Sequence, residues 1–142
     1  MINKTNYNIL IVGCGNIGFR HLEGLLNTEI FLEIVVIEKS NVKLNELAKE
    51  LKKKKLKDKK IFFSNNFSIK NTKFDLVICA TTSSRRYHLL KELVSKFKFS
   101  KILIEKLAFQ NINDFNKTLI LFDKNNINCW VNCPRREQKI YR

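Results

Sequence analysis

Short runs of consecutive apolar residues alternate along the chain with segments in which apolar residues recur at helical spacing. The consecutive runs predict strands at residues 7–12, 31–37, 61–63, 76–80, 102–104 and 127–131. The spaced segments predict a helix over 16–27 and three more, which start at Ser40 or Asn41, at Ser83 or Ser84, and at Asn113. Residues 65–73 are polar and rich in turn formers, so the helix usual at that place is expected to be short or absent.

This alternation predicts the fold class. Each parallel neighbour in a sheet needs a crossover, and a helix supplies it, so the order indicates an α/β fold with a doubly wound, mostly parallel sheet. Ile17 and Leu22 are available for a buried face of the first helix, and the last helix carries Phe115, Leu119 and Phe122. A ligand is expected at the carboxyl ends of the strands.

A glycine-rich turn, GCGNIG at residues 13–18, follows the first predicted strand directly. Gly13 would turn the chain tightly, Gly15 would let the backbone approach a phosphate, and Gly18 would let helix and strand pack closely. The helix that begins at Asn16 and Ile17 would point its unsatisfied N–H groups at the ligand. This arrangement is typical of a site for the pyrophosphate of a dinucleotide.

An acidic residue follows the second predicted strand at the distance that such a turn expects. Glu38 lies 20 residues after Gly18, where a carboxylate can accept hydrogen bonds from both ribose hydroxyls and repel a 2′-phosphate. The sequence therefore favours NAD over NADP as the cofactor. Lys39 and Ser40, directly beyond, keep NADP possible. The alternative for Glu38 is a solvated charge at a strand end.

The chain of 142 residues has a formal net charge of +14, which raises the possibility of nucleic-acid binding. The lysine-rich run at 52–60 would attract phosphates without sequence preference. However, no aromatic residues are interleaved with it as a base-stacking surface would require. A solvated helix end and loop is the preferred interpretation, and nucleic acid is not the expected partner.

The four cysteines lie in strand-like apolar segments, as reduced cysteines that behave as small hydrophobes do. No zinc site is expected, because the paired spacings of zinc ligands are missing. No run is long and apolar enough to span a membrane, and the start of the chain lacks the apolar core of a signal peptide. A cytoplasmic location is therefore expected.

Several strand ends carry polar residues that together resemble a known family. The segments are GCGNIG at 13–18, DLVICATTSSRRYH at 75–88, ILIEKL at 102–107, and a last strand followed by Asn132 and an arginine pair at 135–136. Their order resembles the cofactor domain of the Gfo/Idh/MocA oxidoreductases, which has a Rossmann-like fold. The resemblance implies a nicotinamide cofactor and a sugar, sugar nucleotide or polyol as the substrate.

The resemblance also implies roles for individual residues. Thr81 and Thr82 would border the ribose and pyrophosphate, and His88 would contact the cofactor from the following helix. Glu105 and Lys106 correspond to a Glu-Lys-Pro motif whose lysine lies near the nicotinamide, so Lys106 is the expected catalytic residue. A lysine there polarises an oxygen and relays its proton during hydride transfer. Asn132 and Arg135 complete the implied cofactor-binding set.

The chain departs from the family pattern at two points. Leu107 stands where the motif has proline, so a trans peptide bond and a displaced Lys106 are expected. The substrate domain of the family is expected to be missing, so residues 1–134 would form the NAD(P)-binding domain and 135–142 the start of a connection to the missing part. We expect the chain to bind its cofactor but to lack turnover alone. The alternatives are a non-catalytic nucleotide-sensing module and a lysine-rich nucleic-acid binder.

Overall fold

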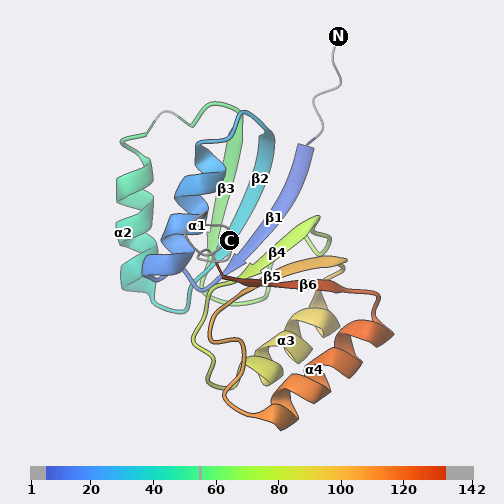
Figure 1. The fold of residues 1–142 in the computed structure, drawn as a ribbon. Helices are drawn as coiled ribbons and strands as arrows, with labels where there is room; N and C mark the ends of the chain where they lie inside the picture. Colours follow the sequence, from blue (N-terminus) through green and yellow to red (C-terminus); the bar gives the residue numbers. More distant parts are fainter. Residues whose placement is uncertain (1–5, 55, 134–142) are drawn as a thin grey trace, which may run out of the picture.

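The structure, a computed structural model, describes residues 6–54 and 56–133 of the chain. Strands and helices alternate along these residues (Figure 1). In chain order the elements are β1 (Asn6–Val12), α1 (Asn16–Leu26), β2 (Phe31–Ile37), α2 (Asn41–Leu51), β3 (Lys59–Ser64), β4 (Leu76–Cys79), α3 (Arg86–Lys96), β5 (Lys101–Glu105), α4 (Ile112–Lys124) and β6 (Asn128–Asn132).

The strands form one sheet in the order β3-β2-β1-β4-β5-β6, and every neighbouring pair is parallel. The chain starts in the middle of the sheet, builds outward to β3, returns to β4 and builds outward to β6. The predicted doubly wound α/β fold is confirmed. The point where the direction reverses lies between β1 and β4, which is where such sheets bind ligands.

Helices cover both faces of the sheet. In Figure 1, α1 and α2 lie on one face of the sheet, over β1 to β3. Helices α3 and α4 lie on the other face, over the half of the sheet formed by β4 to β6. Successive residues of β1 accordingly enter different cores: Ile9 and Ile11 pack on the α1 side, and Leu10 and Val12 on the α3 side. Burial on both faces explains why residues 9–12 of β1 are all apolar.

The strand register brings the site-forming segments to one level. Val12 pairs with Ile37 of β2 and with Cys79 of β4, so these three strands end together. The backbone N–H of Gly13 then donates to the carbonyl of Ile37 (2.8 Å), and that of Ala80 donates to the carbonyl of Val12 (2.9 Å). The segments that follow the three strands are thereby placed side by side.

The connection from β3 to β4 contains no helix, as predicted from its polar, turn-rich composition. Phe67 and Ile69 from this connection instead pack against the core on the α3 side. The ring of Phe97 meets Phe67 and Phe74 edge to face, at centroid distances of 6.1 and 5.5 Å. Aromatic side chains thus cover a region that a helix would otherwise cover.

The predicted starts of two helices are wrong. Helix α3 begins at Arg86, after Arg85 in the left-handed region (φ 54°), and not at Ser83 or Ser84. Helix α4 is capped by Asn111 and not by Asn113: Oδ1 of Asn111 accepts the N–H of Asp114 (2.8 Å). Of the two residues predicted at the start of α2, Ser40 is the cap and Asn41 is not: the hydroxyl of Ser40 accepts the N–H of Lys43 (3.3 Å).

Some apolar residues of the helices lie outside the core. Ile17 is 51% exposed, whereas Leu22 is fully buried on the same helix. On α4, Phe122 is buried, but Phe115 and Leu119 are 41% and 52% exposed.

Within residues 6–54 and 56–133, no helix has the length and apolar character that crossing a membrane would take.

Candidate cofactor-binding site

A cleft of about 550 Å³ lies at the carboxyl ends of β1, β2 and β4. It contains six of the residues predicted to bind the cofactor, which come from four separate segments. These are Gly13, Gly15, Glu38, Thr81, Thr82 and His88. A hollow of about 630 Å³ near the amino ends of the strands contains none of the predicted residues. The chemistry therefore points to the cleft and not to the larger hollow.

The glycine turn forms one wall of the cleft, and two of its glycines are required by close packing. Gly13 has a φ of +83°, and a Cβ there would lie 2.9 Å from Cγ2 of Thr81. A Cβ at Gly18 would lie 2.1 Å from the carbonyl oxygen of Gly13. Nothing lies within 4 Å of a Cβ at Gly15, so this position faces open space in the cleft. Gly13 and Gly18 are thus needed for the fold, whereas Gly15 leaves room for a ligand.

Helix α1 begins within this turn, at Asn16. Gly15 is its N-cap, and within the described residues no side chain caps the helix and no acidic residue lies in its first turn. Asn16 lies beside a smaller hollow of about 210 Å³, together with Phe19 and Lys43. The first N–H groups of such a helix favour an anion, since they lack partners within the helix and carry the positive end of its dipole.

The carboxylate of Glu38 faces the glycine turn and is held by backbone donors. Its Oε2 accepts the N–H of Cys14 (2.9 Å), and its Oε1 accepts the N–H of Ser40 (3.1 Å). Each carboxylate oxygen can accept further hydrogen bonds, so ribose hydroxyls could still bind there. Lys39 and Lys43 also line the cleft. An acidic acceptor and two cations therefore belong to the same cleft.

Cys14 lies within the turn but is not a nucleophile at neutral pH. Its side chain is buried, and burial raises the pKa of the thiol to about 11; the carboxylate of Glu38 adds to this rise, while Lys43 opposes it. The thiol therefore keeps its proton, and the residue contributes to packing.

We expect Cys14 to react slowly with iodoacetamide in the folded chain, since alkylation requires the thiolate. Its rate should keep rising with pH up to about 11 instead of levelling near 9.0. Because the unfolded chain releases this proton first, the residue's contribution to the free energy of unfolding falls as pH rises between these values. Mass spectrometry of the Cys14 peptide measures the rate, with the urea-unfolded chain as the control. A plateau near pH 9 in the folded chain would contradict this assignment.

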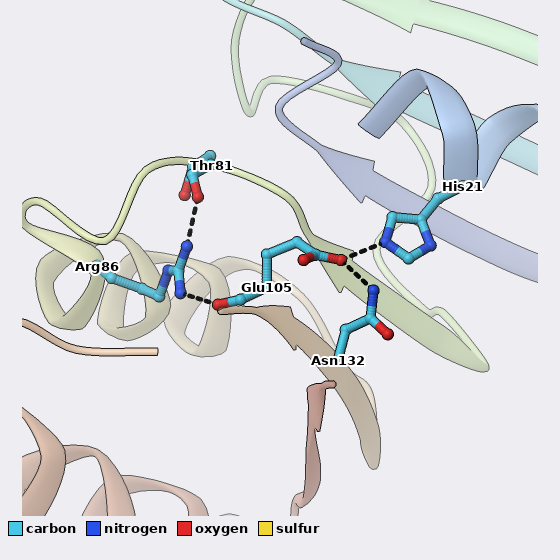
Figure 2. A network of polar contacts seen from close by, with 5 residues as sticks. All are labelled: His21, Thr81, Arg86, Glu105 and Asn132. Atoms are coloured by element: carbon cyan, nitrogen blue, oxygen red, sulfur yellow. Dashed lines mark hydrogen bonds and ion pairs between the residues drawn. The ribbon is translucent and has the colours of Figure 1, made fainter. Parts of the chain in front are cut away.

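A second group of polar residues lies at the ends of β5 and β6. Figure 2 shows His21 and Asn132 pointing toward the carboxylate of Glu105. Nε2 of His21 donates to Oε1 of Glu105 (2.6 Å), and Nδ2 of Asn132 donates to the same oxygen. Glu105 is only 8% exposed and is not among the residues that line the cleft. The network therefore ties α1 to the two strand ends, and sequence reasoning did not assign His21 to it.

Arg86, the first residue of α3, is the other residue that the sequence did not single out. It is 1% exposed, which is rare for arginine. Nη1 donates to the carbonyls of Glu105, Leu107 (2.8 Å) and Ala108 (3.0 Å), and Nη2 donates to the carbonyl of Thr81. Burial lowers the pKa of the guanidinium from its usual value. Only the three-dimensional arrangement distinguishes this arginine from its exposed neighbour Arg85.

Lys106 directly follows β5 and is exposed. The peptide bond between Lys106 and Leu107 is cis, so the expected trans bond is wrong. The carbonyls of Glu105 and Leu107, which flank Lys106, both accept hydrogen bonds from Arg86. This long-range contact is not visible in a motif read along the chain. The predicted residue Arg135 lies outside the described residues.

Comparisons with known proteins bear on this site. A comparison with curated proteins found no match. Among solved structures, a probable dehydrogenase from Thermotoga maritima is 19% identical, with a TM-score of 0.70 over 93% of this chain and 37% of that chain. The WlbA dehydrogenase from Chromobacterium violaceum, in complex with NADH and UDP-GlcNAcA, is 17% identical, with a TM-score of 0.75 over 99% of this chain and 39% of that chain. The WlbA dehydrogenase from Bordetella pertussis, in complex with the same two molecules, is 16% identical, with a TM-score of 0.72 over 96% of this chain and 40% of that chain.

At these identities the structural likeness concerns the fold alone, and the chain spans well under half the length of these three proteins. The family assignment comes from a separate comparison. The family model GFO_IDH_MocA, described as an oxidoreductase family with an NAD-binding Rossmann fold, matches residues 7–133. These residues cover the glycine turn and all of the sheet except Asn6, so the chain belongs to the Gfo/Idh/MocA oxidoreductase family, as its NAD-binding Rossmann domain.

Proposed function

We propose that this chain is the cofactor domain of an oxidoreductase that acts on a sugar, sugar nucleotide or polyol, with NAD as its preferred cofactor. The observation that carries the proposal is the meeting of the glycine turn and the Glu38 carboxylate in one cleft. The sugar part of the proposal is supported by two neighbours in fold, whose solved structures hold NADH and UDP-GlcNAcA. The substrate half of the site would come from a separate domain.

In this proposal different residues of the site bind different parts of the cofactor. The backbone of the glycine turn, with Asn16 and Ile17 at the start of α1, would hold the pyrophosphate. Glu38 would accept hydrogen bonds from the adenosine ribose. Thr81, Thr82 and His88, which line the cleft, would contact the cofactor from the β4 side.

Lys106 is proposed as the catalytic residue. A bound nicotinamide would supply hydride transfer at the substrate carbon. The ammonium of Lys106 would polarise the substrate oxygen and exchange a proton with it. Glu105 and Asn132 would act by holding the end of β5, since the carboxylate of Glu105 accepts hydrogen bonds from both His21 and Asn132. Arg135 keeps its proposed contact with the cofactor.

NADH titration monitored by nicotinamide fluorescence tests the proposal directly. Saturable binding with one cofactor per chain is expected. A chain that shows no saturation at millimolar NADH would overturn the proposed function. Turnover is expected only when a substrate domain is supplied, so binding is the measurement to make on this chain.

Substituting Glu38→Ala should weaken NADH binding by about tenfold and reduce the preference for NADH over NADPH, because the ribose acceptor and the charge that repels a 2′-phosphate are both lost. The change also removes the acceptor of two backbone N–H groups, so thermal unfolding must be measured in parallel. Glu29→Ala is the matched control, because Glu29 is exposed and is not among the residues that line the cleft. Equal affinity of the parent chain for both cofactors would show that Glu38 does not select between them.

A further inference from the structure

Arg86 forms a cross-link between two segments that leave neighbouring strands. One of its terminal nitrogens binds the carbonyl of Thr81, after β4, and the other binds carbonyls of residues 105, 107 and 108, at and after the end of β5. Figure 2 shows the guanidinium between Thr81 and Glu105. All four acceptors are backbone carbonyl oxygens. Through these bonds the side chain holds the backbone of the two segments in place, rather than pairing with a charged side chain.

The two linked segments contribute different parts of the proposed site. Thr81 lines the cofactor cleft, whereas the second segment carries Lys106. We propose that Arg86 is a positioning residue, which sets the place of Lys106 relative to a cofactor bound in the cleft. This inference rests on the proposed function for its catalytic meaning, while the cross-link itself is a property of the fold.

Only an arginine matches this pattern of acceptors. The planar guanidinium presents donors on two separate nitrogens at a fixed spacing, so it can reach both segments at once. A lysine at position 86 would keep the charge but offer a single nitrogen. Within the described residues Nε of Arg86 has no hydrogen-bond partner, so the two terminal nitrogens make every contact of the cross-link.

Hydrogen exchange measured by mass spectrometry tests the cross-link in the full chain. In Arg86→Lys and Arg86→Met, amides within 81–85 and 105–109 should exchange about tenfold faster, because charged hydrogen bonds that restrain these segments are lost. Amides of β1 and β2 should keep their parent rates. Arg20→Met is the matched control, since the side chain of Arg20 is 81% exposed. Unchanged exchange in the two segments, or equal acceleration throughout the sheet, would overturn the positioning role.

A second measurement follows the placement of Lys106 itself. Lys106 is exposed, so N-hydroxysuccinimidyl acetate should acetylate it, and bound NADH should slow that reaction in the parent chain. In Arg86→Lys we expect NADH affinity to stay within about threefold of the parent value while the protection of Lys106 is largely lost. Protection that is retained, or that falls only in proportion to NADH affinity, would contradict the proposal.

The two measurements separate the inference from the proposed function. If the parent chain fails to bind NADH, the proposed function is overturned, and the exchange experiment still decides whether Arg86 links the two segments. If Arg86→Met fails to fold, the Arg86→Lys variant, which keeps the charge, carries the comparison. Local acceleration confined to the two segments supports the cross-link, and global acceleration refutes it.

Discussion

Gly15→Ala is expected to weaken NADH binding by about tenfold or more while the chain stays folded. The added methyl group meets nothing within 4 Å, and the backbone of Gly15 (φ −70°, ψ −164°) suits any residue. The methyl group would instead enter the space in which the backbone is proposed to approach the pyrophosphate. Because alanine is a poorer N-cap than glycine, a loss of stability within about 1 kcal/mol is expected.

The measurement is a fluorescence titration with NADH, paired with thermal unfolding of the ligand-free chain. Gly24→Ala is the matched control, since Gly24 lies within α1 and a Cβ there also meets nothing. That control should bind NADH normally and gain up to about 1 kcal/mol of stability, because alanine is the better helix former. Normal NADH binding by Gly15→Ala would show that the cofactor does not contact this part of the turn.

Gly18→Ala should have the opposite profile, with a loss of about 3 kcal/mol or more in the free energy of unfolding. A Cβ at this position would lie 2.1 Å from the carbonyl oxygen of Gly13 and 3.0 Å from its carbonyl carbon. Both atoms belong to the backbone, so α1 would have to move away from the turn. Cofactor binding should fall as a consequence of the altered turn.

Urea unfolding followed by circular dichroism measures this loss, again with Gly24→Ala beside it. A Gly18→Ala chain with parent stability would show that α1 and the turn can separate without cost. Gly15→Ala and Gly18→Ala together then distinguish a glycine kept for its ligand from one kept for packing.

The local patterns of the sequence were sufficient for the order of elements and for six of the residues that line the cleft. Residues 9–12 of β1 are all apolar because both faces of the sheet are covered there, and the glycine turn is marked by residues adjacent in the chain. The cap of α4 was misplaced by two residues although the sequence held the signal. Asn111 and Asp114 have the spacing of a reciprocal cap, and their side chains do bond to each other (3.2 Å).

Contacts between distant residues were not predictable in this way. His21 and Glu105 are 84 residues apart, and Arg86 reaches carbonyls 19 to 22 residues away. A carbonyl acceptor carries no side-chain signature, so no motif could reveal the partners of Arg86. The exposure of Ile17 was not predictable for a related reason. Periodicity indicates which face of a helix is apolar, but it does not show how much of that face a neighbouring element covers.

The hydrogen bond from Cys14 to Glu38 has a consequence for how cofactor preference could evolve. The residue proposed to recognise the sugar also anchors the loop proposed to hold the phosphates, so one side chain serves two tasks. A mutant lineage that exchanged this carboxylate for an alkyl or basic side chain, which offers no acceptor oxygen, would relax discrimination and loosen the loop in the same step. A change of preference to the phosphorylated dinucleotide would therefore require a second, compensating mutation that restores a hydrogen-bond acceptor for the backbone N–H of Cys14.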